Sequence, residues 1–146
     1  MNVREVAESD RLQWSRMREA LWPGSLSEHD VETRRYFEAR GPGLVTFVAE
    51  VEGQLVGFLE LDERKYAPSC ASSPVAFIEG WYVAPGARGR GVGRALVAAA
   101  ESWARARGHT EMASDAELEN HDGIAAHRAL GYHEAERVVC FRKALP

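Results

Sequence analysis

Residues 83–96 read Val-Ala-Pro-Gly-Ala-Arg-Gly-Arg-Gly-Val-Gly-Arg-Ala-Leu, and the rest of the fold can be worked out from this stretch. The apolar run Phe77 to Val83 before it predicts a strand, and the Ala-rich segment Val92 to Arg107 after it predicts a helix. Alternating glycines and three arginines occupy the junction, residues 86–94. Small residues let free backbone N–H groups approach an anion at a helix N-terminus, where the helix dipole adds positive potential. The stretch therefore predicts an anion-binding loop, with guanidinium groups as further donors.

The spacing within the loop narrows the choice of ligand. A P-loop closes with Gly-Lys-Ser/Thr, but Arg94 and Ala95 stand there, and the strict alternation of glycines breaks the Gly-x-Gly-x-x-Gly fingerprint of dinucleotide sites. Arg88-x-x-Gly91-x-Gly93, between a strand and a helix, resembles the pyrophosphate-binding motif of the GCN5-related N-acetyltransferases. The resemblance implies that acetyl-CoA is bound here. A solvated basic loop is the alternative, and the flanking strand and helix disfavour it.

Composition excludes several classes of protein. A chain of 146 residues with 45% apolar residues predicts a single domain over residues 1–146. A net charge of −4 disfavours nucleic-acid binding and permits a cationic substrate. No signal peptide or bilayer-spanning run is visible, so we expect no membrane association. Cys70 and Cys140 form no metal-binding pattern, so we expect a cytoplasmic protein with reduced thiols and no metal.

The order of periodic segments predicts the fold class. Strands are expected at residues 3–6, 44–51, 54–64, 75–83, 111–115 and 132–141, the last as a bent strand or strand pair. Helices are expected at about residues 9–21, 27–40, 92–107 and 120–130, with caps at Ser9 and in the turn that starts at Ser27. This order predicts a mixed α/β (α+β) domain rather than a doubly wound one. The family resemblance implies a mostly antiparallel central sheet flanked by helices.

Five further segments resemble the aminoglycoside 6′-N-acetyltransferases. They are residues 21–24, 73–83, 112–115 with Asn120, 127–132 and 134–138. This resemblance implies transfer of an acetyl group from acetyl-CoA to the 6′-amine of a polycationic aminoglycoside, antibiotic resistance, and a homodimer to which Trp14, Trp103 and the last strand could contribute. One departure is Ser25, which follows Trp-Pro-Gly where family members often carry His.

The resemblance also assigns roles to individual residues. Backbone groups of the strand before the loop should pair with the pantetheine arm of the co-substrate, and Asn120 should contact the same arm unless it only caps a helix. The residues expected to bind acetyl-CoA are Trp81, Tyr82, Val83, Arg88, Gly89, Arg90, Gly91, Val92, Gly93, Arg94 and Asn120. The residues expected to bind the aminoglycoside are Trp22, Ser25, Tyr66, Glu79, Asp115 and Glu136.

Acetyl transfer to an amine also requires proton transfers. Glu79 or Asp115 is the expected proton acceptor, through water, and His127 is the expected donor to the departing thiolate, with Tyr132 as a weaker candidate. These three, Glu79, Asp115 and His127, are the predicted catalytic residues. Simpler interpretations stay open: His127 as a packed helix residue, Glu136 as a solvated charge, and the side chains of Trp81 and Tyr82 as core.

Two rival functions remain open at this point. One is the same chemistry on another amine, such as a polyamine, a small metabolite or a protein lysine. The other is a non-catalytic acyl-CoA-binding module, which would bind acetyl-CoA without transferring the acetyl group.

Overall fold

Five strands form one sheet in the order β1-β2-β3-β4-β5 in this computed structural model, which describes residues 1–146. Strands β1 to β4 pair antiparallel, and β5 is parallel to β4. The strands span β1 Asn2–Glu5, β2 Val45–Val51, β3 Gln54–Arg64, β4 Val75–Val83 and β5 Met112–Ser114. The predicted mixed α/β class with a mostly antiparallel sheet is confirmed.

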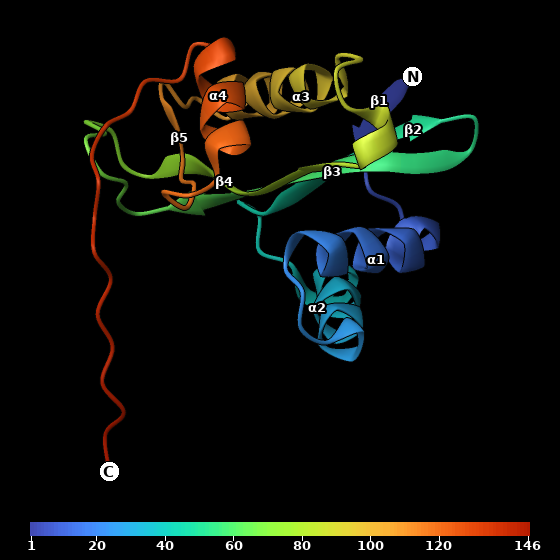
Figure 1. Ribbon diagram of the computed structural model, residues 1–146, viewed down its shortest axis with the longest axis horizontal. Helices are drawn as coiled ribbons and strands as arrows, with labels where there is room; N and C mark the ends of the chain where they lie inside the picture. Colours follow the sequence, from blue (N-terminus) through green and yellow to red (C-terminus); the bar gives the residue numbers. More distant parts are fainter.

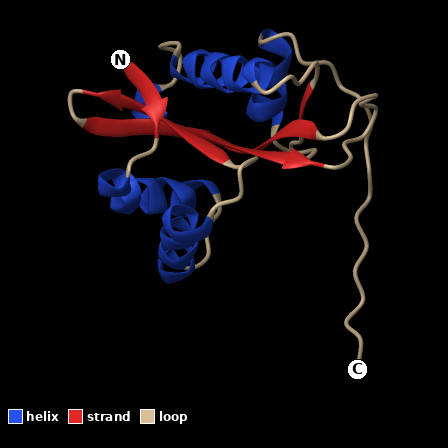
Figure 2. Ribbon diagram, turned by 180° about the vertical axis from the view of Figure 1, so that it is seen from behind, coloured by secondary structure: helices blue, strands red, loops and turns tan.

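Four helices cover the two faces of the sheet (Figure 1). They span α1 Arg11–Leu21, α2 Leu26–Ala39, α3 Val92–Ala106 and α4 His121–Ala129, with short 3-10 turns η1 at Glu8–Asp10 and η2 at Pro85–Ala87. Helices α1 and α2 lie on one face, and α3 and α4 lie on the other, as the view from behind also shows (Figure 2). No helix combines the length and apolar character that crossing a lipid bilayer requires.

The sheet separates two hydrophobic cores. The larger core lies under α3, where Leu96 and Ala100 are fully buried against residues of β2, β3 and β4. The smaller core lies under α1 and α2, where Trp14 contacts Tyr36 edge to face at 5.0 Å. Because both faces are covered, the central strands read as nearly continuous apolar runs. Leu12 lies on the solvent side of α1 and is 60% exposed.

Helix starts differ from the predicted caps by a few residues. Ser25, rather than a residue of the following acidic turn, caps α2, because its hydroxyl accepts the Glu28 N–H at 3.4 Å. At the first helix Asp10, rather than Ser9, fixes the chain entry by accepting the Ala7 N–H at 2.8 Å. Either polar side chain could have capped the first helix, so sequence alone could not choose between them.

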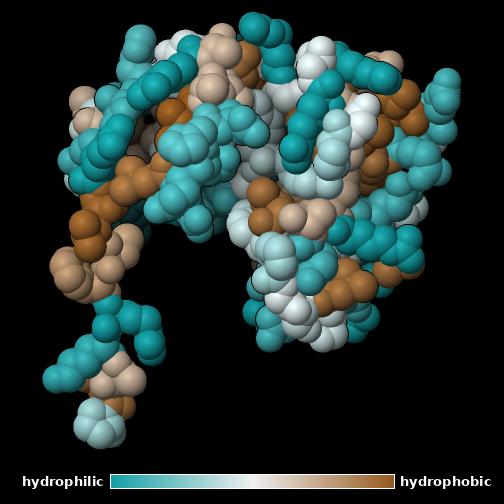
Figure 3. Space-filling model, viewed as in Figure 1, coloured by the Kyte–Doolittle hydropathy of each residue, from teal (hydrophilic) through white to brown (hydrophobic).

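The strand predicted at residues 132–141 is absent from this chain. Residues 133–146 form an extended arm that leaves the body after α4, as all three views show (Figures 1–3). No backbone hydrogen bond involves the arm, and Val139 and Phe141 are 77% and 92% exposed. A strand needs a neighbour to pair with, and within this chain the arm has none.

Candidate active site

The predicted anion-binding loop leaves a row of backbone donors free. No backbone or side-chain oxygen accepts a hydrogen bond from the N–H groups of residues 89–94, which form the loop tip and the first turn of α3. Gly91 is the N-cap of α3 in the left-handed conformation, with φ 81° and ψ 2°, and Gly89 has φ 74°. These conformations favour glycine. The loop thus has the free amides that binding of a diphosphate requires.

The three arginines of the loop differ in what they do. The Nε of Arg88 donates to the Val83 carbonyl at 3.0 Å, so Arg88 holds the loop onto the end of β4. Val83 therefore already uses one of the backbone groups expected to bind the pantetheine arm. Arg90 and Arg94 are exposed beside the free amides, where their guanidinium groups can reach an anion.

Beside the loop, β4 has a free edge. Its pairing with β5 runs only from Ala76–Met112 to Ile78–Ser114, although β4 continues to Val83. The remaining edge of β4 can therefore pair with an extended ligand. We call the space along this unpaired edge the slot. It is open toward the anion-binding loop and ends at Ser114, where the pairing with β5 begins.

Trp81 lies on β4 beside the slot. Its indole packs against Gly93 at the start of α3 and lies edge-on to His127, with the ring centroids 5.1 Å apart. The indole nitrogen is buried and has no hydrogen-bond partner, so it remains an unused donor near the loop. Tyr82 packs with Phe58 in the smaller core. The interpretation of both aromatic side chains as packing residues is confirmed.

Glu79 lies at a β-bulge. The register passes from Leu61–Ile78 to Glu60–Gly80, which leaves Glu79 without an opposite residue. Bulges redirect side chains and are common beside functional sites. The Glu79 carboxylate accepts two hydrogen bonds from Arg64, at 2.7 and 2.6 Å, a partner that the sequence did not indicate.

Two further acids lie near this pair. The Glu79 carboxylate raises the pKa of Arg64, and Asp115 and Asp62 contribute to the same shift, so both lie within electrostatic range of the guanidinium. Burial raises the pKa of Asp62, and the nearby Glu79 adds to that effect. Glu79 and Asp115 directly follow Ile78 and Ser114, the last pair of the β4–β5 register, and Asp62 is an acid that the sequence analysis missed. Three carboxyl groups around one guanidinium make this region net negative and suited to a cation.

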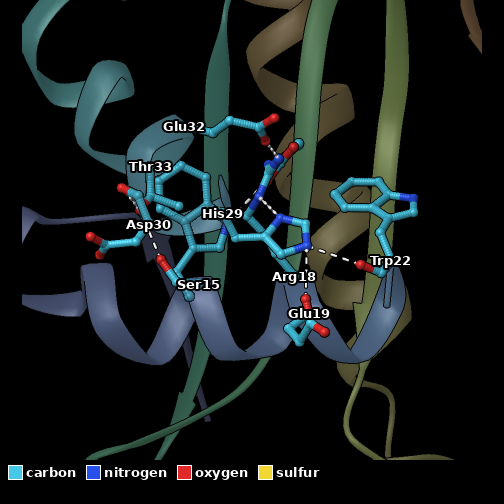
Figure 4. A network of polar contacts seen from close by, with 10 residues as sticks. Ser15, Arg18, Glu19, Trp22, His29, Asp30, Glu32 and Thr33 are labelled. Atoms are coloured by element: carbon cyan, nitrogen blue, oxygen red, sulfur yellow. Dashed lines mark hydrogen bonds and ion pairs between the residues drawn. The ribbon is translucent and has the colours of Figure 1, made fainter. Parts of the chain in front are cut away.

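Trp22 covers the bulge from the α1–α2 side. A Cβ on Gly80 would overlap the Trp22 indole, so glycine is what permits this close approach. His29 Nε2 contacts the Trp22 carbonyl at 2.9 Å, and the Arg18 guanidinium lies 5.0 Å from the centre of the indole (Figure 4). Arg18 in turn pairs with the buried Glu60. This network fixes Trp22 against Gly80, the residue after Glu79, although Trp22 lies in a connecting segment.

Other predicted substrate residues have weaker support. Ser25 serves as the α2 cap described above. Tyr66, in the loop after β3, is 71% exposed, which leaves its ring free to contact a ligand. Glu136 lies on the extended arm and does not join Glu79 and Asp115 within this chain, so that part of the expected grouping is wrong for a single chain. Trp14 is 2% exposed and cannot contribute to an interface.

The α4 residues lie on the β5 side of the slot. Asn120 caps α4, its side-chain oxygen accepting the Gly123 N–H at 3.0 Å, and its amide nitrogen makes no hydrogen bond. His127 contacts Ser114 through Nε2 at 2.7 Å. Tyr132 donates its hydroxyl hydrogen to Glu101 at 3.1 Å, and burial together with Glu101 raises its pKa far above the ordinary value. That hydroxyl is therefore a poor proton donor.

Comparison with known proteins agrees with this geometry. The Acetyltransferase (GNAT) family profile matches residues 14–132. An aminoglycoside N(6')-acetyltransferase type 1 from Klebsiella aerogenes is 47% identical over 146 residues, covering 98% of this chain and 96% of the relative. Aminoglycoside 6'-N-acetyltransferase AAC(6')-IG from Acinetobacter haemolyticus superposes with a TM-score of 0.93 at 35% identity, covering all of both chains. AAC(6')-Iy, in complex with the bisubstrate analogue CoA-S-monomethyl-acetylneamine, superposes with a TM-score of 0.91 at 36% identity, covering 99% of this chain and 98% of that one. With its anion-binding loop, slot and acidic cluster, the chain belongs to the GNAT family of acetyltransferases.

Proposed function

We propose that this protein transfers the acetyl group of acetyl-CoA to the 6′-amine of aminoglycoside antibiotics and thereby confers resistance to them. The observation that carries the proposal is that two sites, the anion-binding loop and the acidic cluster, lie along one strand. The free amides of residues 89–94 lie at one end of the free β4 edge, and the cluster of Asp62, Glu79 and Asp115 lies toward the other. The relatives named above act on or bind aminoglycosides, according to their names.

Acetyl-CoA is the co-substrate of this reaction, and the residues present fit it. The amides of the loop and the guanidinium groups of Arg90 and Arg94 would hold the pyrophosphate, and the edge of β4 would hold the pantetheine arm. The buried indole nitrogen of Trp81 offers one more donor there. A backbone N–H of β4 that faces the slot would stabilise the negative charge that develops on the thioester oxygen.

The amine must lose a proton before it attacks. Ammonium groups of the drug would pair with Glu79 and Asp115, with Trp22 and Tyr66 along the sugar rings. A carboxylate stabilises the ammonium form, so the proton must pass on through water to Asp115 or Glu79. His127 is the proposed source of the proton for the thiolate. We expect this reaction in the cytoplasm, where acetyl-CoA is supplied.

A homodimer is also part of the proposal. The arm of residues 133–146 carries exposed apolar side chains and unpaired backbone, and β5 is a short edge strand. Pairing of the arm with a second copy would satisfy both, and would bring Glu136 to the site of that copy. Sedimentation of the full chain and of a chain ending at Tyr132 tests this: a dimer and a monomer are expected, and two monomers would contradict it.

The activity is tested by thiol release from acetyl-CoA with kanamycin or tobramycin, and the modified nitrogen is identified by NMR of the product. An aminoglycoside that carries a hydroxyl group at the 6′ position is the matched control and should give no acetylated product. Polyamines and lysine peptides tested at the same concentration separate this function from acetylation of other amines. Turnover of those amines alone would reject the aminoglycoside proposal. Expression in a susceptible bacterium tests resistance separately.

A further inference from the structure

Ser114 lies at the closed end of the slot. Ile78–Ser114 is the last paired position between β4 and β5, so the slot closes at the backbone of Ser114, whose side chain contacts His127 of α4. The anion-binding loop follows the opposite end of β4, directly after Val83. An acyl carrier whose phosphates lie in the loop and whose arm lies along β4 therefore points its thioester toward the closed end.

Ser114 forms a hydrogen-bonded pair with His127. The imidazole Nδ1 lies 2.6 Å from the Gly123 carbonyl, which can only accept, so Nδ1 carries a hydrogen. In the neutral ring Nε2 is then an acceptor, and it receives the Ser114 hydroxyl hydrogen across 2.7 Å. Both side chains are half-buried. This arrangement fixes the tautomer of the neutral imidazole and leaves His127 Nε2 behind the serine oxygen.

We propose that Ser114 is the residue that protonates the departing thiolate, with His127 as the positioning residue that resupplies the proton. When the imidazole is charged, its Nε2–H donates to the Ser114 oxygen, and the hydroxyl hydrogen turns toward the slot. As the amine nitrogen bonds to the acyl carbon and the carbon–sulfur bond breaks, sulfur takes the hydroxyl proton. The serine oxygen takes the Nε2 proton at the same time. The products are a thiol, an unchanged serine and a neutral imidazole.

The surroundings of the pair favour this route over others. Tyr132 lies against the imidazole at 6.0 Å between ring centroids, but its hydroxyl is committed to Glu101 of α3. The Trp81 indole, from β4, contributes no charge. Glu101 accepts the Tyr132 hydroxyl hydrogen on the α3 side of the imidazole, and Asp115 is the next residue after Ser114 in the chain. The relay itself requires the charged form of the imidazole.

The first test is the single-turnover rate of Ser114 variants. Ser114→Ala should lower the rate about 10-fold or more, a modest value for loss of general acid catalysis, while the dissociation constants for CoA and tobramycin stay unchanged. Ser114→Thr keeps a hydroxyl group and should recover most of the rate. Ser102→Ala, at an exposed position of α3, is the matched control and should behave as wild type. A wild-type rate for Ser114→Ala would overturn the proposal.

The second test separates a proton donor from a structural serine. The wild-type rate should fall at alkaline pH as the imidazole loses its charge, and this limb should disappear in Ser114→Ala and in His127→Gln. Imidazole nitrogen shifts, measured by NMR without co-substrate at a pH above this limb, should show the neutral ring of His127 with its hydrogen on Nδ1. A neutral ring with its hydrogen on Nε2, or an alkaline limb retained in Ser114→Ala, would refute the relay.

The proposal rests on the acetyl transfer proposed above, and the experiments distinguish the two. A folded wild-type protein that acetylates no amine would reject the function itself. An active wild type with an equally active Ser114→Ala variant would reject only the relay.

Discussion

Replacing Gly91 with alanine tests the anion-binding loop. Gly91 adopts φ 81° and ψ 2°, and a Cβ built there meets no protein atom within 4 Å. The cost to the folded chain is therefore backbone strain alone, about 1–2 kcal/mol for an L-residue in the left-handed region. For domains of about 150 residues or more, a loss of about 1 kcal/mol in the free energy of unfolding lowers the melting temperature by about 2–4 °C. We therefore expect the melting temperature of Gly91→Ala to fall by roughly 2–8 °C.

The effect on co-substrate binding should exceed the effect on stability. The added methyl group lies among the free amides of residues 89–94, where it would push a diphosphate away. Loss of one charge-assisted hydrogen bond, about 1.5–3 kcal/mol, corresponds to roughly a 10- to 100-fold rise in the dissociation constant of CoA. Calorimetry measures this constant directly. Turnover with S-acetylpantetheine, which lacks the pyrophosphate, should be nearly unchanged.

Gly86→Ala is the matched control. Gly86 lies in the same connection, has no positive φ and also has open space around its Cα, so this variant should keep both stability and CoA affinity. The reasoning fails if Gly91→Ala binds CoA as wild type does. It also fails if the variant loses equal activity with acetyl-CoA and with S-acetylpantetheine, since the defect would then not involve the phosphates.

Three other substitutions test individual contacts, one at the candidate site and two that stabilise helix starts. Gly80→Ala should displace the Trp22 indole and raise the KM for tobramycin several-fold while CoA affinity, by calorimetry, stays constant; an unchanged KM would contradict the contact. Ser25→Ala should cost about 1 kcal/mol in urea unfolding through loss of the α2 cap, and a larger change in drug KM than in stability would restore the predicted substrate role. Arg4 lowers the pKa of Asp10, so the ionised carboxylate stabilises the fold above about pH 4 and this stabilisation is lost as pH falls through the lowered pKa. Asp10→Asn should therefore reduce the free energy of unfolding at pH 7 by about 1–2 kcal/mol and by progressively less as the pH falls below about 4, and a deficit independent of pH would contradict this assignment.

Local patterns predicted most of the fold. The strands at Gln54–Arg64 and Val75–Val83 have the predicted bounds, because turn residues and apolar runs mark both ends. The helix after the loop has the predicted start at Val92 for the same reason. The strand predicted at residues 132–141 is absent because these residues have no pairing neighbour within the chain, and sequence alone does not report whether a neighbour is available.

The candidate site was likewise predictable where its contacts are local in sequence and unpredictable where they are not. The loop was predictable because its chemistry is local: alternating glycines and a helix start supply the free amides. The roles of Ser114 and Arg64 were not, since each depends on a partner distant in sequence. Ser114 matters because β4–β5 pairing stops there and His127 lies above it. No spacing in the sequence reports where a parallel pair of strands separates.

Arg64 gives the acidic cluster a defined state before a substrate binds. Without a cation, the carboxylates of Glu79, Asp62 and Asp115 would repel one another. Arg64 offsets this repulsion and orients Glu79 through two hydrogen bonds, yet its side chain is 44% exposed. A pair so exposed is worth about 1 kcal/mol at most, so an ammonium group of the substrate can displace the guanidinium at little cost. The pair therefore keeps the carboxylate oriented while leaving it available for exchange, which a buried ion pair could not do.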